Sequence, residues 1–102
     1  MNTITPEELK ARMDAGETLH IIDVREPGEH AEFNIGGVLH PLGNIMAGDL
    51  DDFEELKDQE VIFYCRSGNR SGQACMMAEN LGFTHAVNLV GGMLAWRQLF
   101  DR

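Results

Sequence analysis

The sequence predicts an α/β domain in which helices cover both faces of a mostly parallel sheet. Short apolar runs of strand length alternate with segments of helical pattern, as expected when helices connect parallel strands. The runs are apolar at most positions, which is typical of strands buried on both faces. The 102 residues, 43% of them hydrophobic, suffice for one core but not for two. We therefore expect a single domain over residues 1–102.

The first helix is expected to begin after Thr5, which is followed by a proline at the first helical position. Thr5 and Glu8 have the spacing of a capping box, and Gly16 is a natural stop. A mostly apolar strand follows over residues 19–24, and one helical turn is expected over residues 27–33. This order of elements is the start of a β-α-β arrangement.

The middle of the chain predicts two weaker elements and one strong one. Residues 38–42 contain Pro41, so they are expected to form only a short or edge strand. Residues 49–56 have the composition of a brief acidic helix. Residues 61–65 are apolar throughout and predict a buried strand that ends at a cysteine.

The last third of the chain repeats the pattern of strand, loop and helix. Residues 71–81 have helical spacing and end at Gly82, residues 86–90 form a short apolar run, and residues 93–100 predict a final helix. No internal repeat or low-complexity tract interrupts this order.

Composition excludes several classes of function. Eight Lys and Arg against seventeen Asp and Glu give a formal charge of −9, which does not favour binding to nucleic acid or to an acidic membrane. The first ten residues lack the pattern of a signal peptide, and no run approaches the roughly 18 apolar residues of a membrane span. We expect a cytoplasmic protein whose two cysteines are thiols. The four histidines show no metal-ligand spacing, so no metal site is expected.

Cys65 is the strongest candidate for a reactive group. It ends a predicted parallel strand and precedes a predicted helix, the place where ligands normally bind in a parallel sheet. The loop N–H groups and the helix N-terminus favour a negative charge, and Arg66 and Arg70 add positive charge nearby. A free thiol has a pKa near ~8.5, so a lower value would make Cys65 a nucleophile. Gly68 allows the loop to curl with a positive φ.

The segment Cys65-Arg66-Ser67-Gly68-Asn69-Arg70-Ser71 resembles the active-site loop of the rhodanese-like family. Three further segments resemble that family in the same order: Asp23-Val24-Arg25-Glu26, Asn34-Ile35-Gly36-Gly37-Val38, and Leu89-Val90-Gly91-Gly92 followed by Trp96. Together they cover nearly the whole chain, and their order makes the resemblance specific. The family's fold is a central, mostly parallel sheet of about five strands between helices.

This resemblance implies a thiosulfate sulfurtransferase-like enzyme that works through a persulfide on Cys65. The donor would be a small sulfur-containing anion such as thiosulfate, and the acceptor a thiophilic molecule, thiol or protein. The family's substrate-binding loop corresponds here to Arg66, Ser67, Gly68, Asn69 and Arg70. No metal or organic cofactor is implied.

Several residues near this pattern are interpreted as structural. Asp23 and Arg25 are expected to form an ion pair or a cap, and Cys75 is expected to pack in the core. Asn34 stands where the family commonly has His, and Gly36 where it commonly has Pro. We interpret both departures as variation in a turn of the scaffold.

The same residues suggest three alternative functions. A phosphatase or arsenate reductase also uses a Cys and Arg loop at a helix N-terminus, but four residues separate Cys65 from Arg70 here, whereas the related phosphatases have five. A non-catalytic interaction module would not require Cys65. A persulfide carrier that exchanges sulfur between proteins remains open.

Overall fold

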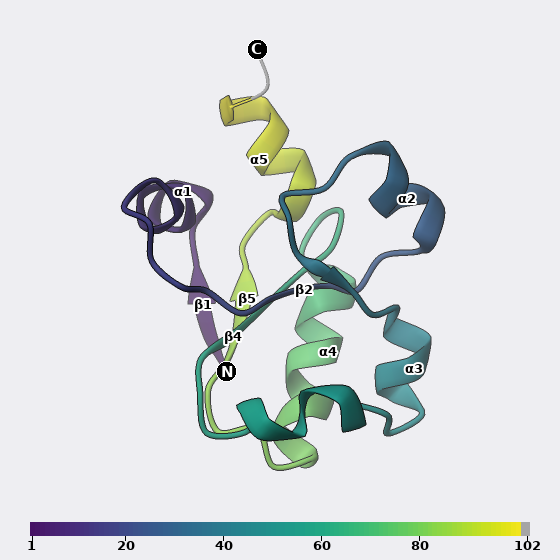
Figure 1. Cartoon of the computed structure of the whole chain (residues 1–102). Coiled ribbons are helices and arrows are strands. Elements are labelled where there is room, and N and C mark those ends of the chain that lie inside the picture. The colour runs from purple at the N-terminus through teal and green to yellow at the C-terminus, as the bar shows by residue number, and fades with distance from the viewer. Residues whose placement is uncertain (101–102) are drawn as a thin grey trace.

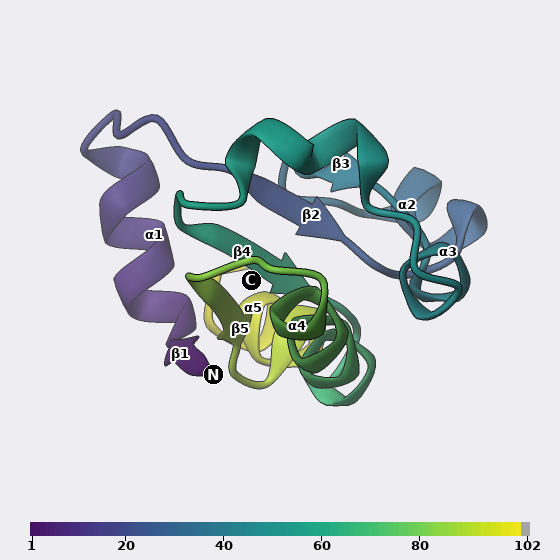
Figure 2. The same ribbon diagram turned by 90° about the horizontal axis from the view of Figure 1, so that it is seen from below.

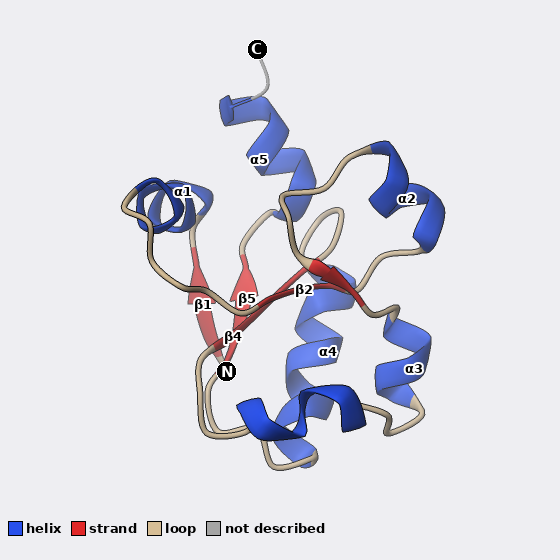
Figure 3. Ribbon diagram, in the orientation of Figure 1, coloured by secondary structure: helices blue, strands red, loops and turns tan. Residues whose placement is uncertain are grey.

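Within the described residues, five parallel strands form one sheet in the order β1–β5–β4–β2–β3. Figures 1 and 3 label β1, β5, β4 and β2 of this sheet. This is a computed structural model, and it describes residues 1–100. The strands are β1 (Asn2–Ile4), β2 (Ile21–Asp23), β3 (Val38–Leu39), β4 (Val61–Tyr64) and β5 (Ala86–Leu89). The predicted fold class is confirmed, and the short strand near Pro41 lies at an edge as expected.

In the part of the chain that the structure describes, five α-helices and one 3-10 helix surround the sheet. They are α1 (Pro6–Asp14), α2 (Pro27–Glu32), α3 (Leu42–Met46), a 3-10 helix (Asp51–Leu56), α4 (Asn69–Asn80) and α5 (Gly92–Phe100). The capping box predicted for the first helix is present, with Thr5 Oγ1 accepting from the Glu8 amide. Within residues 1–100, no helix has the length and apolar character needed to cross a membrane.

Alternation along the central strand β4 builds two cores on opposite faces of the sheet. Phe63 packs with α4 and α3 in one core, while Ile62 and Tyr64 pack with α1 and α5 in the other. This is the period-two alternation of strand side chains. Figure 2 shows β2 and β4 side by side and pointing the same way, with helices on both sides of them.

Two elements were not predicted from the sequence, and one has a different helix type. Strand β1 has only three residues, two of them polar and exposed. Helix α3 has five residues, of which Gly43 and Asn44 are weak helix formers. The acidic segment predicted as a helix is a 3-10 helix over Asp51–Leu56. Such short elements depend on tertiary contacts more than on local pattern.

The strand register places the ends of β2 and β4 at the same edge of the sheet. Asp23 is paired with Tyr64, so the residues after both strands lie side by side. Helix α4 begins at Asn69, two residues earlier than predicted, which leaves a connection of only four residues after β4. Cys65 is the first residue of that connection and lies at the edge where a parallel sheet normally binds ligands.

Candidate active site

The Cys65 side chain is enclosed by the loop that follows it. Its Sγ accepts hydrogen bonds from the backbone N–H of Gly68 at 3.1 Å and of Ser71 at 3.3 Å. Gly68 has φ +101°, the positive value anticipated from the sequence, and it is the N-cap of α4. Cys65 is fully buried.

Opposing effects act on the pKa of the Cys65 thiol. Burial raises the pKa, but hydrogen bonds from the Ser71 side chain and from loop amides lower it by more, so the net shift is downward. The helix N-terminus at the same place also favours the thiolate. The site therefore stabilises a negative charge on sulfur chiefly through loop hydrogen bonds.

Ser71 and Asn88 form a hydrogen-bonded chain behind the sulfur. The Ser71 Oγ lies 3.3 Å from Cys65 Sγ and donates to Asn88 Oδ1 at 2.5 Å. Asn88 Nδ2 donates to the Gly68 carbonyl oxygen at 3.1 Å. A hydroxyl has one proton, so at any moment Ser71 donates either to Asn88 or to the sulfur.

The N-terminus of α5 fixes the backbone of the loop from the other side. The amides of Met93 and Leu94 donate to the carbonyl oxygens of Cys65 and Arg66, both at 2.9 Å. Gly92 has φ +53°, and a Cβ added there would lie 2.4 Å from the Cys65 carbonyl oxygen. This close approach explains why a glycine stands at this position.

The two loop arginines have different surroundings. Arg66 is exposed, and among residues 1–100 no carboxylate lies at salt-bridge distance from it. Arg70 binds the Glu29 carboxylate of α2 through two hydrogen bonds of 2.8 and 2.9 Å. The hydrogen bond from Arg70 lowers the pKa of Glu29 to about 2. Of the two loop arginines, Arg66 is therefore the one that has no carboxylate partner within the described residues 1–100.

Asp23 and Arg25 form the buried ion pair that the sequence suggested. Arg25 Nη2 lies 2.8 Å from Asp23 Oδ2, and His30 Nδ1 lies 2.8 Å from the same oxygen. Arg25 also donates to the carbonyl oxygen of Phe33. Burial raises the pKa of Asp23, but hydrogen bonds from Arg25 and His30 more than offset it, so its pKa is lowered. The cluster ties the end of β2 to α2.

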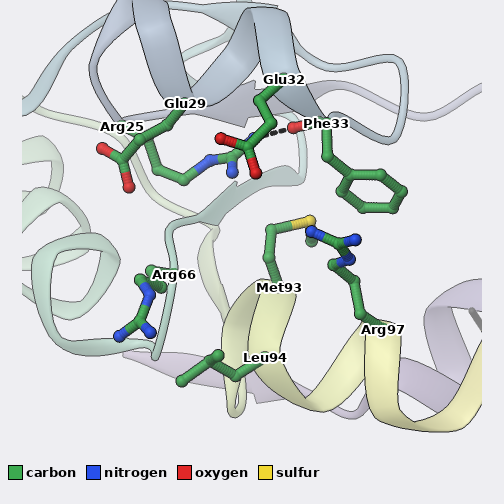
Figure 4. A pocket seen from close by; sticks show the side chains of 8 residues that line it. All are labelled: Arg25, Glu29, Glu32, Phe33, Arg66, Met93, Leu94 and Arg97. Atoms are coloured by element: carbon green, nitrogen blue, oxygen red, sulfur yellow. Dashed lines mark hydrogen bonds between the residues drawn. The ribbon is translucent and has the colours of Figure 1, made fainter.

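A cavity of about 340 Å³ opens beside the Cys65 loop. Figure 4 shows the eight side chains that line it: Arg25, Glu29, Glu32, Phe33, Arg66, Met93, Leu94 and Arg97. The guanidinium carbon of Arg97 lies 4.7 Å from the centroid of the Phe33 ring. Arg66 is the member that belongs to the Cys65 loop. The cavity thus combines an apolar wall with side chains of both charges.

Three of the residues assigned to the scaffold, Cys75, Asn34 and Gly36, are not among those that line this cavity. Cys75 is fully buried in the core on the α4 face, and burial raises its pKa to about 12. Asn34 Oδ1 accepts from the amide of Gly36, which has φ +89°. A proline could not adopt that φ, so the two departures from the family pattern occur together in one turn.

The sequence predicted the Cys65 loop but not the side chains that form hydrogen bonds with it. Ser71, Asn88 and Glu29 all contact it, and none was a predicted site residue. One signal was available for Asn88, because it is a polar residue inside the apolar run of β5. Glu29 had no local signal, since it lies on a different helix from Arg70.

Comparison with known proteins gives consistent matches. Residues 5–99 match the family described as Rhodanese-like domain. The chain is 42% identical over 95 residues to the putative sulfurtransferase YtwF of Bacillus subtilis, covering 91% of this chain and 87% of YtwF. It is 39% identical over 97 residues to the probable adenylyltransferase/sulfurtransferase MoeZ of Mycobacterium tuberculosis. That match covers 93% of this chain but only 24% of MoeZ.

Solved structures show the same fold. A rhodanese-like domain protein from Staphylococcus aureus superposes with a TM-score of 0.83 at 34% identity, covering 94% of this chain and 91% of that chain. A protein of unknown function from Rhodopseudomonas palustris, described as a possible tyrosine phosphatase, has a TM-score of 0.84 at 25% identity. It covers 97% of this chain and 81% of that one.

Proposed function

The chain belongs to the rhodanese-like domain family, and on that premise we propose that it transfers a sulfane sulfur through a persulfide on Cys65. A donor such as thiosulfate would supply the sulfur, and a thiophilic acceptor, either a small thiol or a protein, would remove it. The observation that carries the proposal is the cysteine sulfur held by two loop amides at the N-terminus of α4. Relatives of this chain named sulfurtransferases support the same reaction class.

The proposed reaction has two balanced steps. The Cys65 thiolate attacks the outer sulfur of thiosulfate, the S–S bond of the donor breaks, and sulfite leaves with the bonding electron pair. The resulting persulfide carries one negative charge on its terminal sulfur, which is bonded to the Sγ atom that the amides of Gly68 and Ser71 contact. An acceptor nucleophile then attacks the terminal sulfur, and the electron pair returns to Cys65. No oxidant or reductant is needed.

The loop residues Arg66, Ser67, Gly68, Asn69 and Arg70 are proposed to bind the donor and the persulfide. Arg66 lines the cavity and is exposed, which suits contact with an anionic donor. Gly68 contributes an amide rather than a side chain. In this proposal the backbone stabilises sulfur, while the arginine side chains attract the donor.

Phosphatase chemistry is a weaker candidate for this site, although one structural neighbour is described as a possible phosphatase. Four residues lie between Cys65 and Arg70, and two amides already converge on the single sulfur atom. A loop of this length, with its amides directed at one point, suits a single sulfur atom better than a tetrahedral oxyanion. A protein-to-protein persulfide carrier would use the same Cys65 chemistry.

A steady-state assay with thiosulfate and cyanide tests the proposal. Cys65→Ser should abolish thiocyanate formation, because oxygen is a much weaker nucleophile toward sulfur. Cys75→Ser is the matched control, since it makes the same change at a buried cysteine of the core, and most activity should remain. Activity that survives in Cys65→Ser but not in Cys75→Ser would show that the roles are assigned wrongly. Hydrolysis of a phosphate ester without sulfur transfer would favour the phosphatase.

A further inference from the structure

The ion pair between Glu29 and Arg70 connects α2 to the first turn of α4. Its two hydrogen bonds each join one guanidinium nitrogen to one carboxylate oxygen, at 2.8 and 2.9 Å. Glu29 Oε1 also accepts from the Glu26 amide at 3.0 Å, which fixes the carboxylate on its own helix. Arg70 is therefore held by a carboxylate that lines the cavity.

Arg70 has a second possible partner in the loop that it belongs to. Hydrogen bonding to Glu29 is the main reason that the pKa of Arg70 is raised, and the negative charge of a Cys65 thiolate raises it further. Both side chains of the ion pair are about one-third exposed, with fractions of 33% for Arg70 and 32% for Glu29. An anion that enters the loop would thus compete with Glu29 for the same guanidinium.

We propose that Glu29 is a positioning residue that sets donor specificity by holding Arg70 away from the donor. The inference rests on the proposed sulfur transfer at Cys65. A dianionic donor such as thiosulfate gains most from two arginines, yet it must displace Glu29 to obtain the second. A donor with a single negative charge loses less, because Arg66 alone can balance it. The loop consequently favours donors of low negative charge.

Glu29→Gln is the variant that isolates this effect. Glutamine keeps a carbonyl oxygen for the Glu26 amide, and it is accepted at this capping position, so α2 should persist. Glu32→Gln is the matched control, because it removes the same charge from the same helix and the same cavity. It leaves the hydrogen bonds between Glu29 and Arg70 intact.

The experiment compares two donors that differ in one charge. Thiosulfate carries two negative charges, and methanethiosulfonate replaces one charged oxygen by a methyl group and releases methanesulfinate instead of sulfite. A complete charge-assisted contact changes kcat/KM by about 10- to 150-fold. Because Arg70 is partly exposed, we expect Glu29→Gln to raise kcat/KM for thiosulfate by about 3- to 20-fold. The change should be mainly in KM and less than about twofold for methanethiosulfonate.

Two comparisons decide whether Glu29 acts through Arg70. The gain from Glu29→Gln should vanish in an Arg70→Ala background, and Glu32→Gln should give a clearly smaller gain. Equal gains in both glutamine variants, equal gains with both donors, or a gain that survives in Arg70→Ala would overturn the inference. A loss of thiosulfate use in Glu29→Gln would overturn it as well. Absence of any persulfide on wild-type Cys65 with either donor would instead refute the proposed function itself.

Discussion

Replacing Gly92 by alanine should both destabilise the fold and disturb the Cys65 loop. The new Cβ would lie 2.4 Å from the Cys65 carbonyl oxygen and 2.7 Å from that of Arg66. Alanine also disfavours the observed φ of +53°, at a cost of about 1–2 kcal/mol. Relief of the overlap adds about 1–3 kcal/mol. Together these terms lower the free energy of unfolding by about 2–5 kcal/mol, a large part of the roughly 5–15 kcal/mol of a typical domain.

Urea unfolding followed by the fluorescence of the single tryptophan, Trp96, measures this loss. Gly43→Ala is the control, because Gly43 lies in α3 with ordinary φ and has no atom within 4 Å of an added Cβ. That change should leave stability the same or raise it by up to about 1 kcal/mol. A loss below about 1 kcal/mol for Gly92→Ala, with unchanged sulfur transfer, would refute the role given to the N-terminus of α5.

Three further predictions concern the titration and the charges of the site. Alkylation of Cys65 by iodoacetamide should have its midpoint below the ~8.5 of a free thiol, while Cys75, with a pKa of about 12, should stay unmodified near neutral pH; a midpoint of 8.5 or above would contradict this. Arg66→Ala should lower kcat/KM for thiosulfate by about 10- to 150-fold, and Arg70→Ala by less because Glu29 already binds it; kinetics showing the reverse order would contradict the assigned surroundings. The pKa of Glu29 falls from 4.5 to about 2 on folding, so its contribution to stability is present above pH 4.5 and is lost as the pH falls toward 2. Between pH 4.5 and pH 2, the urea concentration at the unfolding midpoint should fall more in the wild type than in Glu29→Gln. Equal falls would refute this contribution of Glu29 to stability.

Local pattern predicted the parts of the fold that are locally determined. The capping box at Thr5 and the apolar run of β4 both depend on neighbouring residues alone, and both are found as expected. Strand β1 is different, because its pairing with β5, not its own polar sequence, makes it a strand. Tertiary contact decides such short edge elements.

The candidate site also contains one part that local pattern predicts and one part that it does not. The position of Cys65 at the end of a parallel strand follows from the order of strand, loop and helix. The contacts of Arg70 with Glu29 and of Ser71 with Asn88 join residues 41 and 17 positions apart. They depend on how α2 and β5 pack around the loop, which no local pattern specifies. The expectation that both arginines bind the donor therefore did not take into account Glu29, the carboxylate that binds Arg70.

Mass spectrometry of the intact protein after exposure to thiosulfate tests the central claim most directly. The account predicts the added mass of one sulfur atom, located on the peptide that contains Cys65 and removed on addition of cyanide with formation of thiocyanate. Cys75→Ser should gain the same mass, and Cys65→Ser should gain none. Sulfur found on Cys75, or no added mass with thiosulfate or with a persulfide donor, would contradict the assignment of Cys65 as the sulfur-carrying nucleophile.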